Sequence, residues 1–408
     1  MAETLISPGV LARENDTSFV SQGPVTAGAA IIGPTVKGPV EIPTVVTSYS
    51  QFEQIFGSSF QSGSPAQTYS YFTSIAAYNY FNNGGISLLV ARVVTGSYSP
   101  ATSSLIVSAS GATTSVFRLE TLSEGTIMNN DGTQDSAGAL VSGSTDNVRW
   151  NIVNSNSSSG TFDLLVRRGN DNTLEQTVLE TWTNLSLDPF SPNYISKVIG
   201  DQYYTLQTDG GTGTKYLQLT GNYPNKSAYI RVGSVNLTTP NYFTNAGIPN
   251  PIYTGSLPIN ASGSFGGALG SVRGGAKFYG DINATDTQGL TGGNYNDMIA
   301  LLANQDDYKY NVLLTPGLCD ANQPNQVTQI ITNTQNRGDA IYVIDPVGYG
   351  VGSVTTVTSQ ASTRNTSYAA EYWPWCQIQD PATGQNVWVP ASTVIAGVYA
   401  YNDSVSEP

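Results

Sequence analysis

The residue types that usually perform acid–base and metal chemistry are scarce in this chain. The sequence contains no histidine. Histidine is the commonest general base near neutral pH and the commonest metal ligand. Its absence removes the Ser-His-Asp and Cys-His mechanisms and most zinc sites. We therefore expect a protein that is not an enzyme, with no catalytic residue, no metal site and no cofactor.

Two aspartates remain as candidates for acid–base or metal chemistry. Asp339 and Asp345 flank a short apolar run that is a predicted strand. An aspartate at a strand end more often forms a turn, because its side chain bonds to the backbone two residues further on. We therefore interpret both as turn formers rather than as the site of a hydrolase.

A phosphate-binding loop and a reactive thiol are equally weak hypotheses. The stretch from Gly33 to Gly38 contains glycine and proline, but it lacks the Lys-Ser/Thr pair and the following helix of a P-loop. The two cysteines, Cys319 and Cys376, are too few for a disulfide framework and fit folding in a reduced cytoplasm.

Composition limits the classes of partner. The 408 residues carry a net charge of −13, whereas nucleic-acid binding needs a basic footprint that displaces counterions. The first residues lack the basic and apolar stretches of a signal peptide, and the apolar run at 87–94 is far too short to span a bilayer. We therefore expect a soluble protein that binds no nucleic acid and has no direct stable membrane insertion.

The elements that would position any site begin with short apolar runs between turn residues. Residues 29–32 and 45–46 are predicted strands, and Phe52 and Phe56 are spaced for a short helix ended by Gly57. Residues 64–67 read Ser-Pro-Ala-Gln, a capping box with proline at the first helical position. This predicts a helix with an aromatic core face, starting there and ending at the Asn-Gly-Gly turn at 83–85. Residues 86–94 are a predicted buried strand.

Between about residues 96 and 268 the pattern changes to polar alternating runs separated by Ser/Asn/Gly clusters. A β-rich insertion is predicted, with a short helix near 192–200. A surface module is the simpler interpretation, and a carbohydrate- or receptor-binding domain is the alternative. No tryptophan–carboxylate motif makes that alternative specific. The predicted strands lie at 114–119, 148–153, 161–167, 216–220 and 228–237.

From about residue 289 the pattern returns to alternating helices and strands. Asn294 is a predicted helix cap with Asp297 in the first turn. Helices are predicted at 324–337, ended by Gly338, and at 354–364. Strands are predicted to start near 311, 340 and 368, at intervals of 29 and 28 residues that each hold a helix. Such spacing predicts right-handed crossovers and a parallel sheet.

The stretch from 367 to 403 is the densest in aromatic and apolar residues. Residues 368–373 are a predicted buried strand broken at Pro374, and residues 380–384 are a predicted turn. Ser392 is a predicted N-cap of the next helix. Residues 403–408 are polar and acidic, which is typical of the start of a linker.

This stretch also resembles the signature block of contractile tail sheath proteins, which form the contracting outer cylinder of phage tails and related injection machines. The residues that carry the resemblance are Ala369-Ala370, Tyr372, Pro374-Trp375, Asp380-Pro381, Gly384, Pro390-Ala391-Ser392 and Ala396 to Ala400. The segments at 27–57 and 83–94, with Arg92, resemble the core domain of the same family. In that family the block runs on into a C-terminal domain, so we expect this chain to lack that domain and to assemble poorly without it.

The N-terminal residues have two interpretations. Pro8, Gly9, Val10, Leu11 and Glu14 belong to a turn followed by an alternating stretch. From the residues alone, an edge strand of the protein's own sheet is as good an interpretation as a segment that adds a strand to a neighbouring subunit. The family resemblance implies an inter-subunit arm over residues 1–22 and favours exchange.

Together these observations predict an α/β core with a mainly parallel, discontinuous sheet, formed by residues 23–95 and 269–408, with a β-rich protruding insertion at 96–268. The resemblance implies a subtilisin-like arrangement of that core. It implies a virion structural protein that polymerises around an inner tail tube and contracts. The implied partners are copies of itself in stacked rings, the tail tube protein, the baseplate and the tail terminator, in a virion tail assembled in the host cytoplasm. The alternative is a receptor- or glycan-binding virion protein.

Overall fold

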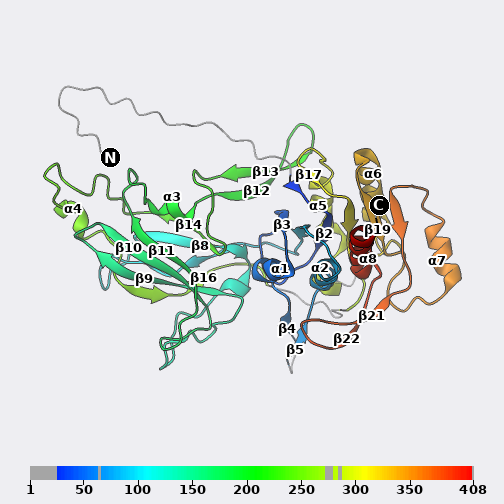
Figure 1. Cartoon of the computed structure of the whole chain (residues 1–408), viewed down its shortest axis with the longest axis horizontal. Helices are drawn as coiled ribbons and strands as arrows, with labels where there is room; N and C mark the ends of the chain where they lie inside the picture. The colour runs from blue at the N-terminus through cyan, green and yellow to red at the C-terminus, as the bar shows by residue number, and fades with distance from the viewer. Residues whose placement is uncertain (1–24, 63–65, 272–278, 284–286, 407–408) are drawn as a thin grey trace.

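The computed structural model describes residues 25–62, 66–271, 279–283 and 287–406. The proposed arm at 1–22, with Pro8 to Leu11 and Glu14, lies outside the described residues, as do Ser64 and Pro65. Within these ranges the protein is a mixed α/β fold with several sheets (Figure 1).

One six-stranded sheet organises the fold, and strands from both ends of the chain form it. The strand order is β20-β19-β18-β2-β6-β3. Neighbouring strands are parallel except for β3, which runs antiparallel to β6. The parallel sheet predicted from the spacing of the later strands is therefore confirmed, and β2 joins it to the first part of the chain. The strands are β2 (Ala29–Gly33), β3 (Thr44–Val46), β6 (Leu88–Arg92), β18 (Val312–Leu314), β19 (Ile341–Ile344) and β20 (Ala369–Glu371).

Both faces of this sheet are apolar, and alternation along each strand divides the side chains between two hydrophobic clusters. In β2, Ala30 and Ile32 belong to one cluster, whereas Ala29 and Ile31 belong to the other. Strands β6, β18 and β19 divide in the same way. A strand buried on both faces reads as a continuous apolar run rather than as an alternation. This is why residues 29–32 and 88–92 were recognisable as core strands.

Helices cover both faces. One face carries α1 (Tyr49–Phe56), α2 (Phe72–Asn82) and α8 (Ser392–Val405), and the other carries α5 (Asn296–Leu301) and α6 (Pro324–Arg337). Phe52 and Phe56 are fully buried, and α1 ends at Gly57 as predicted. Helix α7 (Val354–Ala361) buries none of its side chains and lies at the outer end of the molecule, beyond β20 (Figure 1).

The middle of the chain forms a second body of antiparallel strands (Figure 1). One four-stranded sheet has the order β14-β8-β7-β16 and the other β11-β10-β9-β15. A separate hydrophobic cluster, whose buried members all lie between Ala101 and Ala268, fills the space between them. The elements are β7 (Pro100–Ser103), β8 (Phe117–Glu124), β9 (Val148–Asn156), β10 (Thr161–Arg168), β11 (Val178–Ser186), α3 (Ile195–Ile199), β14 (Ile230–Val235), α4 (Pro251–Thr254), β15 (Ala261–Gly263) and β16 (Phe265–Gly266).

Smaller elements complete the described chain. The hairpin of β12 (Tyr203–Thr208) and β13 (Lys215–Thr220) extends from the middle body, and its Leu206 and Leu217 pack against the core. Two further hairpins are formed by β4 (Phe60–Ser62) with β5 (Gln67–Tyr69) and by β21 (Cys376–Gln379) with β22 (Asn386–Val389). A short parallel pair joins β1 (Val25–Thr26) to β17 (Tyr308–Lys309). Turns of 3-10 helix lie at Thr126–Met128, Thr287–Gly289 and Gly292–Tyr295.

The helix start predicted at Ser64 is wrong. Gln67–Tyr69 form strand β5, and α2 begins only at Phe72, after Tyr71, which provides no side-chain cap. The rings of Phe60 and Tyr71 stack with their centroids 4.7 Å apart. This tertiary contact holds the segment in a hairpin, and it outweighs the local capping pattern, whose contribution is about 1 kcal/mol. The predicted end of the helix at Asn83 is confirmed.

Four smaller expectations are also corrected. Thr291, not Asn294, is the cap at the helix start, and Asn294 closes the capping box from the third position. Ser392 is the first helical residue rather than the N-cap. The predicted linker at 403–408 is wrong up to Val405, because α8 continues to that residue. The predicted buried strand at 368–373 is only half-buried, because β20 is the edge of the sheet.

Candidate functional site

In open parallel sheets, ligands bind outside the carboxyl ends of the strands, at the point where the chain's connections turn in opposite directions. Here that point lies between β2 and β18, because β2 leads to β6 on one side and β18 leads to β19 on the other. Pro34 follows β2, Thr315 follows β18 and Asp345 follows β19. This carboxyl edge is therefore the candidate functional site.

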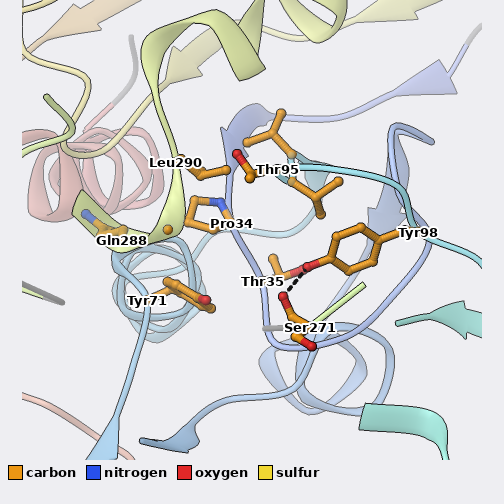
Figure 2. Close-up of a pocket in the computed structure, with 11 residues that line it drawn as sticks. Pro34, Thr35, Tyr71, Thr95, Tyr98, Ser271, Gln288 and Leu290 are labelled. Carbon is orange, nitrogen blue, oxygen red and sulfur yellow. Dashed lines mark hydrogen bonds between the residues drawn. The ribbon is translucent and has the colours of Figure 1, made fainter. Parts of the chain in front are cut away.

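The edge is filled by side chains of the protein itself. Gln288 adopts a left-handed backbone conformation with φ of 56°, and its side chain, 1% exposed, donates to the Gly280 carbonyl at 3.0 Å. A pocket of about 20 Å³ remains beside it, which is room for about one water molecule. Figure 2 shows Pro34, Tyr71 and Gln288 around this pocket, with the Tyr98 hydroxyl donating to the Ser271 carbonyl at 2.6 Å. A substrate does not fit there.

Asp345 is the carboxylate at the centre of the edge. Its Oδ2 atom accepts from the Ser392 hydroxyl at 2.6 Å, and its Oδ1 atom accepts from the Ser392 backbone N–H at 3.0 Å. A longer bond of 3.4 Å comes from the Gly317 N–H. Burial raises the pKa of Asp345 to about 6, and these bonds from Ser392 and Gly317 partly offset the rise.

The Asp345–Ser392 pair is a helix cap rather than a catalytic dyad. Ser392 is 0% exposed and Asp345 3% exposed, so neither meets a substrate. The carboxylate satisfies the first N–H of α8 and lies at the positive end of the helix dipole. Our interpretation of Asp345 as a local turn former is therefore wrong, because its oxygens bond across the fold.

Asp339 does not join Asp345 in a site. The two residues lie at opposite ends of β19, which runs from Ile341 to Ile344. Asp339 accepts from the Nε and Nη2 atoms of Arg337 at 3.0 Å each, and its side chain is 38% exposed. The structure therefore separates the two aspartates that the sequence offered as a carboxylate pair.

A second acidic group lies near the end of β20. Asp320, 0% exposed, forms an ion pair with Arg364 and accepts from Gln360 at 3.0 Å. Both carboxylate oxygens of Glu371 are buried and have no hydrogen-bond partner among the described residues. Burial, and then the charge of Asp320, raises the pKa of Glu371 to about 7, while Arg364 lowers it. Sequence analysis did not identify these residues.

The thiols and the glycine loop do not supply a reactive group. Burial raises the pKa of the Cys319 thiol well above its usual value and raises that of Cys376 as well, so both are protonated near neutral pH. In the glycine loop, Lys37 is 7% exposed and forms an ion pair with Asp146 at 3.4 Å. That lysine points into the fold rather than towards a phosphate.

Two general searches cover the described residues only. In those ranges, no three His, Cys, Asp or Glu side chains come together in a way that would hold a metal ion. Within the same ranges, none of the helices combines the length and the apolar character needed to cross a bilayer. The predicted arm residues Pro8, Gly9, Val10, Leu11 and Glu14 lie outside those ranges.

No protein-family model matches the sequence, and no curated protein matches it. The solved structures that resemble the chain include two sheath tail proteins. The sheath tail protein from Desulfitobacterium hafniense gives a TM-score of 0.38 at 11% identity, over 96% of this chain and 61% of that one. The sheath tail protein from Listeria innocua gives a TM-score of 0.45 at 9% identity, over 93% of this chain and 57% of that one. This chain thus spans about three fifths of each, and likenesses of this strength establish no function by themselves.

Proposed function

We propose that the chain is a structural subunit of a contractile tail sheath, which polymerises around an inner tail tube and contracts to drive the tube through a target envelope. One observation carries the proposal. The segments that resemble the sheath family, at 27–57, 83–94 and 369–400, are far apart in the sequence. They contribute β2, β6 and β20 to one sheet, and α8 to the helices that pack on one face of that sheet. A chance likeness at three separate places has no reason to converge on one sheet.

The proposed organisation is an arm at 1–22, a core of 23–95 and 269–408, and an insertion at 96–268. The separate cluster between Ala101 and Ala268 supports an independent core for the insertion. Arg92 supports a firm joint between the core and the insertion, because it donates to the Gly38 carbonyl of the core at 2.6 Å and to the Glu124 carbonyl of the insertion at 3.0 Å. A firm joint is what a subunit that transmits force needs. The subtilisin-like arrangement of the core is part of the same proposal.

The proposed role is mechanical rather than enzymatic. At the carboxyl edge, Asp345 and Asp320 are consumed by bonds to Ser392 and Arg364, and the remaining space is about 20 Å³. These contacts support a fold in which the carboxyl edge of the sheet, where parallel sheets often bind ligands, is occupied by contacts within the chain. The proposed partners are neighbouring copies in stacked rings, the tail tube, the baseplate and the tail terminator, in a virion tail.

Immunogold electron microscopy tests the proposal. An antibody raised against residues 96–268 is applied to tailed particles released from cells that make this protein. Gold along the whole length of an outer cylinder is the expected result. Gold confined to a tip or fibre would replace the sheath with the receptor- or glycan-binding alternative, and gold on no particle would overturn both. A pre-immune serum on the same grids is the control.

A further inference from the structure

A groove lies between the helices α1 and α2 and the turn of the β21–β22 hairpin, and it shares no lining residue with the pocket at the carboxyl edge. Its volume is about 370 Å³. Tyr49, Glu53 and Tyr78 line it from the helices, and the turn residues Gln379 to Ala382, with Gly384, line the other side. This volume is in the range of small-ligand and side-chain sites.

The charged residues of the groove are all acidic. Glu53 lies one helical turn after Tyr49 and is exposed. Asp380 is 0% exposed, and its oxygens accept from the hydroxyls of Ser70 at 3.0 Å and Tyr279 at 3.1 Å and from the Ala382 N–H at 3.0 Å. All three donors are neutral. Among the described residues, neither carboxylate forms an ion pair with a lysine or arginine.

The charges of Glu53 and Asp380 both act on the hydroxyl of Tyr49. Burial raises the pKa of Tyr49 to about 12, its bond to Ser74 lowers it, and the charges of Glu53 and Asp380 raise it further. The ring of Tyr49 meets that of Tyr78 edge to face, with centroids 5.1 Å apart and planes at 78°. The groove therefore combines two aromatic rings with two carboxylates that have no cationic partner among the described residues.

The same chain shows which group completes such an arrangement. Arg231 stacks over the Tyr203 ring at 4.5 Å and forms an ion pair with Glu120 at 2.7 Å. Arg337 stacks over Tyr310 at 4.1 Å and pairs with Asp339. In both places a tyrosine and a carboxylate hold an arginine. The groove has the tyrosine and the carboxylate, and no arginine is among the described residues that line it.

We propose that this groove binds an arginine side chain presented by a partner protein. A planar guanidinium stacks on an aromatic face and donates to a carboxylate at the same time, whereas the ammonium of lysine is a more strongly hydrated point charge. The charge and the rings of the groove match those two properties of arginine. This inference stands independently of the sheath proposal.

Ligand-observed NMR on the full-length protein tests it with a small probe, N-acetyl-arginine amide. A dissociation constant on the order of 1 mM is expected for a ligand of this size. The neutral isostere N-acetyl-citrulline amide should bind at least about tenfold more weakly, and the lysine analogue about threefold more weakly. Added salt should weaken arginine binding, because the contribution of Glu53 is exposed to solvent.

Two variants locate the site. Glu53→Gln should weaken arginine binding about fivefold, and Tyr78→Leu should weaken it by a similar factor. Glu175→Gln changes another exposed glutamate, in the middle body, and should leave binding unchanged. Equal binding of arginine and citrulline probes, stronger binding of lysine, or a Glu53→Gln variant that binds like the wild type would each overturn the proposal. If Tyr78→Leu unfolds, Glu53→Gln still decides.

Discussion

Two adjacent hydroxyls at the start of α8 offer a matched test of the Asp345 cap. Ser392 and Thr393 are both 0% exposed. The Ser392 hydroxyl donates to Asp345 at 2.6 Å, whereas the Thr393 hydroxyl has no hydrogen-bond partner within the described residues. Ser392→Ala removes a bond to a buried carboxylate. Thr393→Val removes a hydroxyl that has no partner in the described part of the chain, with almost no change of shape.

The expected magnitudes follow from these environments. A hydrogen bond to a charged group contributes about 1.5–3 kcal/mol. Without the Ser392 hydroxyl, the Oδ2 atom of Asp345 keeps only the 3.4 Å contact from the Gly317 N–H. We expect Ser392→Ala to lower the free energy of unfolding by about 2 kcal/mol at pH 7.5. Thr393→Val should leave it unchanged or raise it by about 1 kcal/mol, because a buried unpaired hydroxyl is unfavourable.

The pH dependence has a defined sign. Burial raises the pKa of Asp345 from 3.8 to about 6, so the folded protein holds this proton more tightly than the unfolded chain. Its contribution to stability is complete below about pH 4 and is lost as the pH rises through about 6, a change of about 3 kcal/mol. The Ser392 bonds lower this pKa. Removing the hydroxyl raises it further, so the cost of Ser392→Ala should be smaller at pH 5 than at pH 7.5.

Urea unfolding followed by tryptophan fluorescence measures these differences at pH 5.0 and 7.5 for the wild type and both variants. Circular dichroism confirms that each variant is folded before denaturation. Equal losses for Ser392→Ala and Thr393→Val would show that burial alone, not the bond to Asp345, sets the cost. A Ser392→Ala loss that is the same at both pH values would refute the assigned ionisation of Asp345.

Four further results are expected. Gly338 ends α6 with φ of 73°, so Gly338→Ala should destabilise the protein by about 1 kcal/mol in the same urea assay. Arg92→Met, which removes the two bonds to the Gly38 and Glu124 carbonyls, should cost about 2–3 kcal/mol, whereas the exposed Arg168→Met should cost nearly nothing. Glu371→Gln should flatten the fall in stability between about pH 4.5 and 7, because the raised pKa of Glu371 makes its ionisation unfavourable in the folded state; an unchanged pH profile would contradict this. Deleting residues 1–20 should leave the melting transition intact but prevent long cylinders by electron microscopy; unfolding would place Val10 in an internal strand.

Local sequence signals were sufficient to predict a helix or strand where residues within or next to the element determine where it begins and ends. Helix α6 starts at Pro324 and ends at Arg337, as predicted, because proline is favoured in the first turn and Gly338 adopts the left-handed conformation. The parallel strands β18 and β19 were predictable from their apolar runs and the helical interval between them. At Ser64 an equally good local signal failed, because the stacking of Phe60 on Tyr71 is a contact that local capping does not reveal.

The candidate site was less predictable, because its contacts join distant residues. Asp345 and Ser392 are 47 positions apart, and Asp320 and Arg364 are 44 apart. No spacing rule links such pairs. The sequence did indicate that Asp345 follows a strand, which places it at the carboxyl edge. It did not indicate that the N-terminus of α8 packs against that carboxylate. It also did not indicate that Gln288 fills the carboxyl edge between β2 and β18.

The carboxylates of the fold differ in burial and in partners between the carboxyl edge and the groove at α1, α2 and the β21–β22 turn. Asp320, Asp345 and Asp171 are buried, and each meets a donor from its own chain, either an arginine or the start of a helix. Burying a charge without such a partner is costly, so these contacts fix the packing of the elements that supply them. Glu53 lies at the surface and forms no ion pair with another described residue, which costs little in an exposed position. Glu53, beside the two tyrosines of the groove, can therefore remain available to a cation from a partner protein at little cost to the stability of the fold. A docking groove needs such a residue.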